Sequence, residues 1–204
     1  MTLSRLLTRA IARGDGACAV DPDSDIIDLV ARGDTDAAVR CVMRRYGVAL
    51  YRYCRAGLGD AALAEDVQQQ VFVEVHRDLP RFTRRSRLKI WLFAIARHRV
   101  YDAAKRRRRA RRHVADDADD VDAVDPRPSA AESVDEARLR AALVDCLAAL
   151  PDATRAALLL RYQQGFSFAE MAAICGERPS TLCARISRVL PRLRRDIESR
   201  IGPL

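Results

Sequence analysis

Residues 168–190 read FAEMAAICGERPSTLCARISRVL and contain two amphipathic stretches separated by a glycine. The first stretch has apolar residues at helical spacing, and the second begins near Pro179, a residue favoured in the first turn of a helix. Gly176 lies between them and can adopt the left-handed conformation that a tight turn requires. Ala172 is small enough for two helices to cross closely. The stretch therefore predicts a helix-turn-helix.

A helix-turn-helix places the N-terminal part of its second helix in the major groove of DNA. The side chains that would face outward there are Arg178, Ser180, Thr181, Ala184, Arg185 and Arg188. Arg185 or Arg188 could bind guanine edges with a forked guanidinium, whereas serine and threonine hydroxyls could bind phosphates. An ordinary helical hairpin with a solvated basic face has the same spacing, so both interpretations stay open at this point.

The rest of the chain also shows the three- and four-residue spacing of helices. Apolar residues recur at this spacing over residues 39–54, 63–79, 88–96 and 139–150, and a shorter helix is expected around residues 26–30. Aromatic residues make up only 5% of the chain and glycines number only 9, which disfavours a sandwich or barrel of short strands. The sequence therefore predicts an all-α protein.

Charge is strongly segregated along the chain, whose net charge is +8. Residues 77–112 carry a net charge of +13, whereas residues 113–136 carry −8 and have few large apolar side chains. Such a composition cannot bury enough apolar surface to offset the entropy of ordering. We therefore expect two small helical domains joined by a flexible acidic linker. The expected boundaries are a flexible N-terminal extension over 1–24, a helical domain over 25–112, the linker over 113–136 and the helix-turn-helix domain over 137–204.

The basic segment suits a second nucleic-acid surface. It interleaves arginines with four aromatic residues, Phe82, Trp91, Phe93 and Tyr101. Aromatic rings stack on unpaired bases while cations hold the backbone. Residues 105–112 include seven basic residues in eight and would bind backbone without reading sequence. The alternative is that Trp91 and Phe93 belong to the core and that the arginine run is a solvated helix end, and for Trp91 core packing is the favoured interpretation.

Little in the sequence points to catalysis or to a metal. The three histidines lack ligand spacing, and there is no glycine-rich phosphate loop or nucleophile motif. The six cysteines include no C-x-x-C pair and mostly lie on apolar stripes, so reduced buried thiols in a cytoplasmic protein are expected. We expect no enzyme activity, no cofactor and no metal site. We also expect no membrane insertion, because no run of about 18 apolar residues exists.

Two separated blocks resemble the bacterial extracytoplasmic-function (ECF, group four) sigma factors of RNA polymerase. The first comprises AEDVQQQVF at 64–72 and WLFAIARHRVYDAAKRRRR at 91–109. The second is LPDATRAALLLRYQQGFSFAEMAAICGERPSTLCARISRVLPRLR at 150–194. Their order and separation match the family pattern over most of residues 25–200. The resemblance implies a transcription initiation factor that binds core RNA polymerase and promoter DNA and that an anti-sigma factor holds inactive.

The resemblance also implies a role for each patch. Asp66, Gln69 and Gln70 would dock on the clamp of the polymerase's largest subunit, although Gln70 stands where the family usually has Glu. Residues 80–89 and the start of the next helix would hold an unpaired base of the −10 element. The residues implied in −10 contacts are Arg81, Phe82, Arg84, Arg85, Arg87, Arg97, His98, Asp102, Lys105 and Arg106. The helix-turn-helix would read the −35 element as duplex through its six outward residues.

Parts of the sequence also fit two other classes of function. A stand-alone helix-turn-helix regulator is the main alternative, and it would not need the 64–72 helix. A thiol or zinc sensor is a third class, which metal analysis would test.

Pro191 lies inside the last expected helix, where it should bend the chain. The charge pattern predicts that the free protein masks itself and that salt loosens the domains, because exposed charges are screened over about 8–10 Å.

Overall fold

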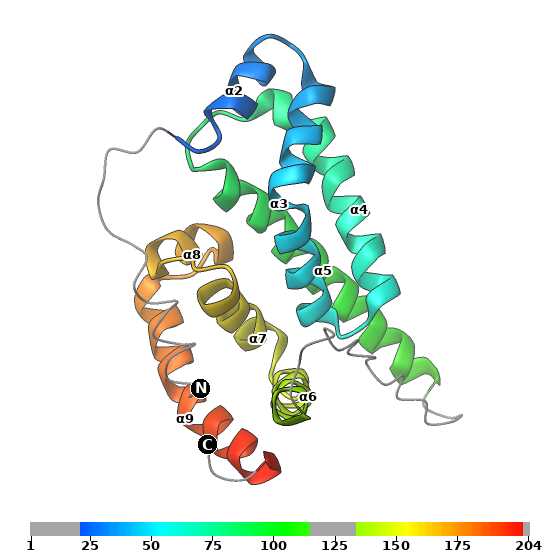
Figure 1. Ribbon diagram of the computed structural model, residues 1–204, viewed down its shortest axis with the longest axis vertical. Helices are drawn as coiled ribbons and strands as arrows, with labels where there is room; N and C mark the ends of the chain where they lie inside the picture. Colours follow the sequence, from blue (N-terminus) through cyan, green and yellow to red (C-terminus); the bar gives the residue numbers. More distant parts are fainter. Residues whose placement is uncertain (1–20, 115–133, 202–204) are drawn as a thin grey trace.

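The computed structural model describes residues 21–114 and 134–201, which form helices and no strands (Figure 1). The N-terminal module contains α2 (Ser24–Ala31), α3 (Thr35–Leu58), α4 (Ala61–Asp78), the 3-10 turn η1 (Leu79–Arg81) and α5 (Leu88–Val114). The C-terminal module contains α6 (Val134–Ala148), α7 (Asp152–Leu158), the π-helical turn η2 (Leu159–Gln163), α8 (Phe168–Cys175) and α9 (Pro179–Ile201). The expected all-α fold is confirmed for the part of the chain that the structure describes.

Local capping sets the helix boundaries of the N-terminal module. Asp34 accepts a hydrogen bond from the Ala37 N–H at 3.0 Å and starts α3, and Asp60 accepts one from the Leu63 N–H at 2.9 Å and starts α4. Gly59, between α3 and α4, has a φ of +73°, and this left-handed conformation ends α3. The turn between α3 and α4 therefore lies in the gap between the stretches of helical spacing at 39–54 and 63–79.

The two flanking helices each extend a few residues into the segment 113–136 that was expected to be the linker. α5 continues through Val114, and α6 begins at Val134. The rest of that segment and residues 1–20 lie outside the described residues. In the last helix, α9 continues through Pro191 and remains one element.

The long helices of the N-terminal module pack through apolar stripes, because α3 contacts both α4 and α5, and α4 contacts α5 (Figure 1). The stripe on α4 consists of Ala64, Val67, Val71 and Val75, all at most 1% exposed. The stripe on α5 includes Leu88, Leu92, Phe93, Ala96, Val100 and Ala103. Burial of these stripes leaves the polar faces of α4 and α5 for partners.

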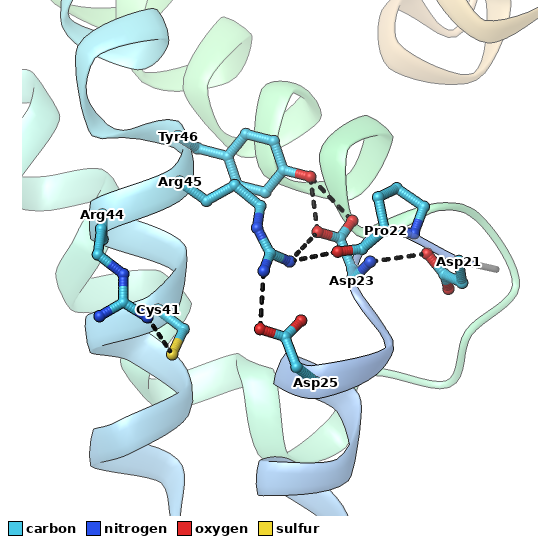
Figure 2. Close-up of polar contacts among 8 residues, drawn as sticks. All are labelled: Asp21, Pro22, Asp23, Asp25, Cys41, Arg44, Arg45 and Tyr46. Atoms are coloured by element: carbon cyan, nitrogen blue, oxygen red, sulfur yellow. Dashed lines mark hydrogen bonds and ion pairs between the residues drawn. The ribbon is translucent and has the colours of Figure 1, made fainter. Parts of the chain in front are cut away.

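The segment before α2 is fixed to α3 by a buried carboxylate (Figure 2). Asp23 is 1% exposed and accepts hydrogen bonds from the Tyr46 hydroxyl at 2.7 and 2.9 Å and from Arg45 at 2.9 Å. Arg45 also donates to the exposed Asp25 at 2.7 Å. Burial and the Asp23 carboxylate raise the pKa of Tyr46. Residues 21–24, expected in the flexible extension, therefore belong to the folded module.

Asp23→Ala should lower the free energy of unfolding by about 1–2 kcal/mol, because Tyr46 and Arg45 lose an acceptor that burial keeps from water. Urea denaturation followed by circular dichroism measures the change. Asp25→Ala is the matched control, since it removes an exposed partner of the same arginine, and its effect should be clearly smaller. Equal losses for the two variants would contradict the importance of burial at Asp23.

The helix-turn-helix expected from residues 168–190 is confirmed as α8 and α9. A capping box starts α8, in which the Ser167 hydroxyl accepts from the Glu170 N–H at 3.2 Å and the Glu170 carboxylate accepts from the Ser167 N–H at 2.8 Å. Gly176 ends α8 in the left-handed conformation, with φ of +67°. Leu182 and Ile186 of α9 are buried, which turns the opposite side of that helix outward.

The two modules pack against each other. α8 lies along α5, while α7 and η2 lie against α3 (Figure 1). The buried apolar residues of both modules form one continuous cluster. This contact joins residues far apart in the sequence, and it determines which parts of the candidate DNA-binding surface remain exposed.

Candidate polymerase- and DNA-binding surfaces

One face of α4 carries the residues assigned to polymerase binding. Asp66, Gln69 and Gln70 are exposed there, while Val67 and Val71 are buried against the rest of the module. Within the part of the chain that the structure describes, none of these three side chains forms a hydrogen bond or an ion pair. The α4 face can therefore offer one carboxylate and two amides to a partner.

The same face of α4 has an apolar centre that sequence reasoning missed. Val73 is 69% exposed, and it follows Asp66 by seven residues and Gln69 by four, which is one side of a helix. The available signal was that Val73 falls outside the four-residue spacing of the buried valines. An exposed valine surrounded by polar groups suits a protein contact better than a nucleic-acid contact.

The surface assigned to the −10 element follows η1 and continues along α5. Its exposed side chains are Arg81, Arg84, Arg85, Arg87, His98, Lys105 and Arg106. Arg84 adopts a left-handed φ of +56° in the loop. His98 Nδ1 lies 3.2 Å from a carboxylate oxygen of Asp102, one helical turn later. The arrangement offers several guanidinium groups to a phosphate backbone from a loop and a helix at once.

The aromatic residues of this surface fall into two groups. Phe82 and Trp91 are half-buried, and their ring centroids lie 5.2 Å apart with planes tilted by 46°. Phe93 is fully buried, with its ring centroid 5.6 Å from that of Tyr53. Phe93 therefore belongs to the core, as the alternative interpretation of the segment held, whereas Phe82 and Trp91 pack against the core and remain partly exposed.

Arg97 differs from the other cations of the −10 surface. It is half-buried and lines a small gap of about 20 Å³ between the modules, together with Tyr53, Gly57 and Arg155. It lies beside Cys175 of α8, where it lowers the pKa of the Cys175 thiol against the larger, raising effect of burial. The guanidinium of Arg97 therefore faces the C-terminal module.

The exposed face of α9 begins at the N-terminus of the helix. The residues on it are Ser180, Thr181, Ala184, Ser187 and Arg188, and Arg178 is exposed in the preceding turn. Arg188 Nε donates to the Ala184 carbonyl oxygen at 3.1 Å, so the side chain lies along this face. Ser187 was not among the residues expected there. The 100° rotation per residue places Ser187 only about 60° from Ala184, which is the signal that could have found it.

Arg185 lies at the edge of this face and already has a partner. Its Nη1 donates to Glu177 Oε1 at 2.9 Å and its Nη2 contacts Oε2, and each side chain is 25% exposed. The pair lowers the pKa of Glu177 and raises that of Arg185. A guanidinium occupied by a carboxylate fork is less available to guanine, which leaves Arg188 and Arg178 as the unobstructed arginines of the face.

Features of other function classes are scarce in the described residues. No cluster of His, Cys, Asp and Glu in these residues could hold a metal ion. No helix among them combines the length and apolar character that crossing a bilayer requires. Burial raises the pKa of the Cys54 thiol to about 12, which keeps it protonated and unreactive at neutral pH.

Two family models match the chain in the two modules. Residues 42–120 match Sigma-70 region 2, and residues 140–193 match Sigma-70, region 4. The first match contains the α4 face and the −10 surface, and the second contains the helix-turn-helix. A stand-alone helix-turn-helix regulator would account only for the second.

Characterised relatives agree with these matches. The chain is 34% identical over 143 residues to the ECF RNA polymerase sigma factor SigC of Mycobacterium tuberculosis, covering 70% of this chain and 75% of SigC. It is 32% identical over 183 residues to the ECF RNA polymerase sigma factor BldN of Streptomyces coelicolor, covering 86% of this chain and 68% of BldN. The sigma factor RpoE, solved in complex with the anti-sigma factor NepR from Bartonella quintana, superposes with a TM-score of 0.66 at 26% identity, over 78% of this chain and 96% of RpoE. This chain belongs to the ECF family of RNA polymerase sigma factors, transcription initiation factors that direct the enzyme to promoters.

Proposed function

We propose that this sigma factor binds core RNA polymerase through the exposed face of α4, reads −35 duplex with α9, and holds the unpaired −10 strand on residues 80–89 and α5. The observation that carries the proposal is that each of these surfaces is largely exposed and chemically suited to its partner. The α4 face is polar with an apolar centre, and the other two surfaces are basic.

The two proposed DNA-binding surfaces suit different forms of promoter DNA. Duplex DNA presents base edges in the major groove, which the helix face from Ser180 to Arg188 can enter. An unpaired base presents a ring, which the Phe82–Trp91 pair can stack against. Flipping a base costs a few kcal/mol, so stacking and backbone contacts must offset that cost during promoter opening.

Binding to core polymerase followed by run-off transcription tests the proposal. The purified full chain should associate with core RNA polymerase from the source bacterium and produce discrete start sites on genomic fragments. The sequences upstream of those start sites would define the −35 and −10 elements. Duplex DNA binding without polymerase association would overturn the proposal in favour of a stand-alone regulator.

Val73→Arg should weaken binding to core polymerase by about tenfold or more, because a charge at the centre of the α4 face must be desolvated without a partner. Gln69→Ala should act in the same direction with a smaller effect. Fluorescence anisotropy of the labelled full chain against core polymerase measures both. Binding to −35 duplex by the same preparations should be unchanged, and a parallel loss there would indicate misfolding instead.

We also propose that an anti-sigma factor restrains this chain, because the similar sigma factor RpoE was solved in complex with the anti-sigma factor NepR. Such a partner should form a one-to-one complex with the full chain and abolish run-off transcription at an equal concentration. A bound protein that leaves transcription unchanged would contradict the assignment of that partner.

A further inference from the structure

A pocket of about 300 Å³ lies where the second half of α5 meets the start of α7. Its walls are formed by Tyr101, Lys105, Arg108 and Arg109 of α5 and by Asp152 of α7. The volume is at the lower end of the range of small-molecule sites, which is about 300–1,000 Å³. Three cations against one carboxylate give the walls a net charge of +2. The pocket therefore suits a compact anion.

The guanidinium of Arg108 is held in place from one side. Its Nη2 donates to the Asp152 carboxylate, and that carboxylate also accepts a hydrogen bond from Arg155 at 3.1 Å. Arg155 is only 9% exposed and is fixed in turn, because it donates to the carbonyl oxygens of Leu150 at 3.1 Å and Gly57 at 2.9 Å. The ion pair uses one nitrogen of Arg108, whose guanidinium carries five N–H donors. A guanidinium oriented in advance loses little further entropy when it binds an anion.

Lys105 and Arg109 complete the cationic wall of the pocket. Both are exposed, lie one helical turn apart, and have no hydrogen-bond or ion-pair partner in the part of the chain that the structure describes. Positive charge is concentrated here, since burial lowers the pKa of Arg155 and the charges of Arg107 and Arg108 lower it further. A ligand with two adjacent negative groups would relieve this repulsion, and a diphosphate combines that charge with strong acceptor oxygens.

An aromatic ring lies at the other end of this row of side chains. Tyr101 is 47% exposed, and it precedes Lys105 by one helical turn and Arg109 by two, which is about 12 Å along the helix axis. An exposed ring can stack on any nucleobase, because every base has a π-face. The row therefore offers a ring and then phosphate-binding cations, in the order in which a nucleotide presents its base and its phosphates.

We infer that this pocket binds a nucleoside diphosphate or triphosphate, with the base on Tyr101 and the phosphates on the three cations. A DNA strand presents the same phosphate chemistry, and Lys105 also belongs to the proposed −10 surface. The pocket favours the smaller ligand, because Asp152 and the held Arg108 wall it on the side of α7, whereas a strand that follows α5 needs an open path. The nucleotide site does not depend on the −10 role of Lys105.

Fluorescence anisotropy of ADP that carries a methylanthraniloyl label, titrated with the full chain, tests the inference. The buffer contains EDTA and about 150 mM NaCl, which screens charges beyond about 8 Å and so weakens attraction to a loose basic surface. One ADP should bind per chain, and inorganic pyrophosphate should displace it. Absence of saturable binding of either probe would overturn the inference.

A pair of arginine variants tests the phosphate end of the site. Arg109→Ala should weaken binding of ADP and of pyrophosphate about tenfold, because it removes a charged donor from the pocket wall. Arg106→Ala is the matched control: it removes the same charge from an exposed position of the same helix, but Arg106 does not line the pocket, so both affinities should stay within about twofold of the wild type. Equal losses for the two variants would mean that the arginine run attracts phosphates without a site, and would overturn the inference.

Tyr101→Ala tests the base end of the site. It should weaken binding of ADP about tenfold and leave binding of pyrophosphate unchanged, because only the nucleotide has a base to stack. The substituted side chains are exposed, so the thermal unfolding temperature of each variant should match that of the wild type. A fluorescein-labelled single strand of DNA separates the two sources of phosphate. Loss of strand binding in Arg109→Ala with ADP binding intact would assign these cations to DNA and overturn the inference.

Discussion

Arg188→Ala should weaken binding of the full chain to its mapped −35 duplex by about 1–3 kcal/mol, which is roughly a 5- to 150-fold loss. Arg188 is exposed on the outward face of α9, one turn after Ala184, and its guanidinium has no carboxylate partner among the described residues. A guanidinium in that position can bind the O6 and N7 atoms of guanine together, and the residues beside it on this face of α9, Ala184 and Ser187, carry no guanidinium. Competition assays with native and scrambled duplexes measure the loss.

The comparison with Arg185 makes the test specific. Arg185 is engaged by Glu177 at the edge of the face, so Arg185→Ala should have a smaller effect on −35 binding than Arg188→Ala. Equal losses on native and scrambled duplex for Arg188→Ala would mean that Arg188 contacts only phosphate. A larger loss for Arg185→Ala would mean that the pair with Glu177 opens on DNA and that Arg185 reads the base.

The features that the sequence predicted are those with local signals. Gly59 ends α3 in the gap between two stretches of helical spacing, and Gly176, expected in the turn of the helix-turn-helix, ends α8. Buried stripes at three- and four-residue spacing located the long helices. These signals act within a few residues of the chain, so a single sequence carries them in full.

The features that the sequence did not predict depend on contacts between distant residues. Asp23 is buried only because Tyr46 and Arg45 lie across from it. Glu177 and Arg185 are eight positions apart and meet only through the turn geometry. The packing of Phe166 on Phe93 joins two modules whose apolar patterns are each complete without it. The exposure of Val73 is different, because its position outside the four-residue spacing of the buried valines was a signal within the sequence.

Promoter opening should depend strongly on the aromatic pair of the −10 surface. Phe82→Ala and Trp91→Ala should each make the free energy of promoter opening less favourable by about 1–3 kcal/mol, the value of one base stacked on an aromatic ring, and so lower the yield of open complexes. The two rings are in contact and half-buried, so their effects should not add in the double variant. Permanganate reactivity of unpaired thymines in the −10 region measures the open fraction. Tyr101→Ala, which removes an exposed aromatic of α5, is the control and should change the yield little.

A promoter that is already unpaired at −10 separates base capture from duplex recognition. On such a template the polymerase no longer has to offset the cost of unpairing, so the yield from Phe82→Ala and Trp91→Ala should recover toward the wild-type value. Arg188→Ala should not recover, because its −35 contact is made to duplex DNA in either template. If the aromatic variants stayed defective on the unpaired template while their thermal stability was normal, the pair would act in polymerase binding or in positioning α5, and the assignment of the −10 surface would have to change.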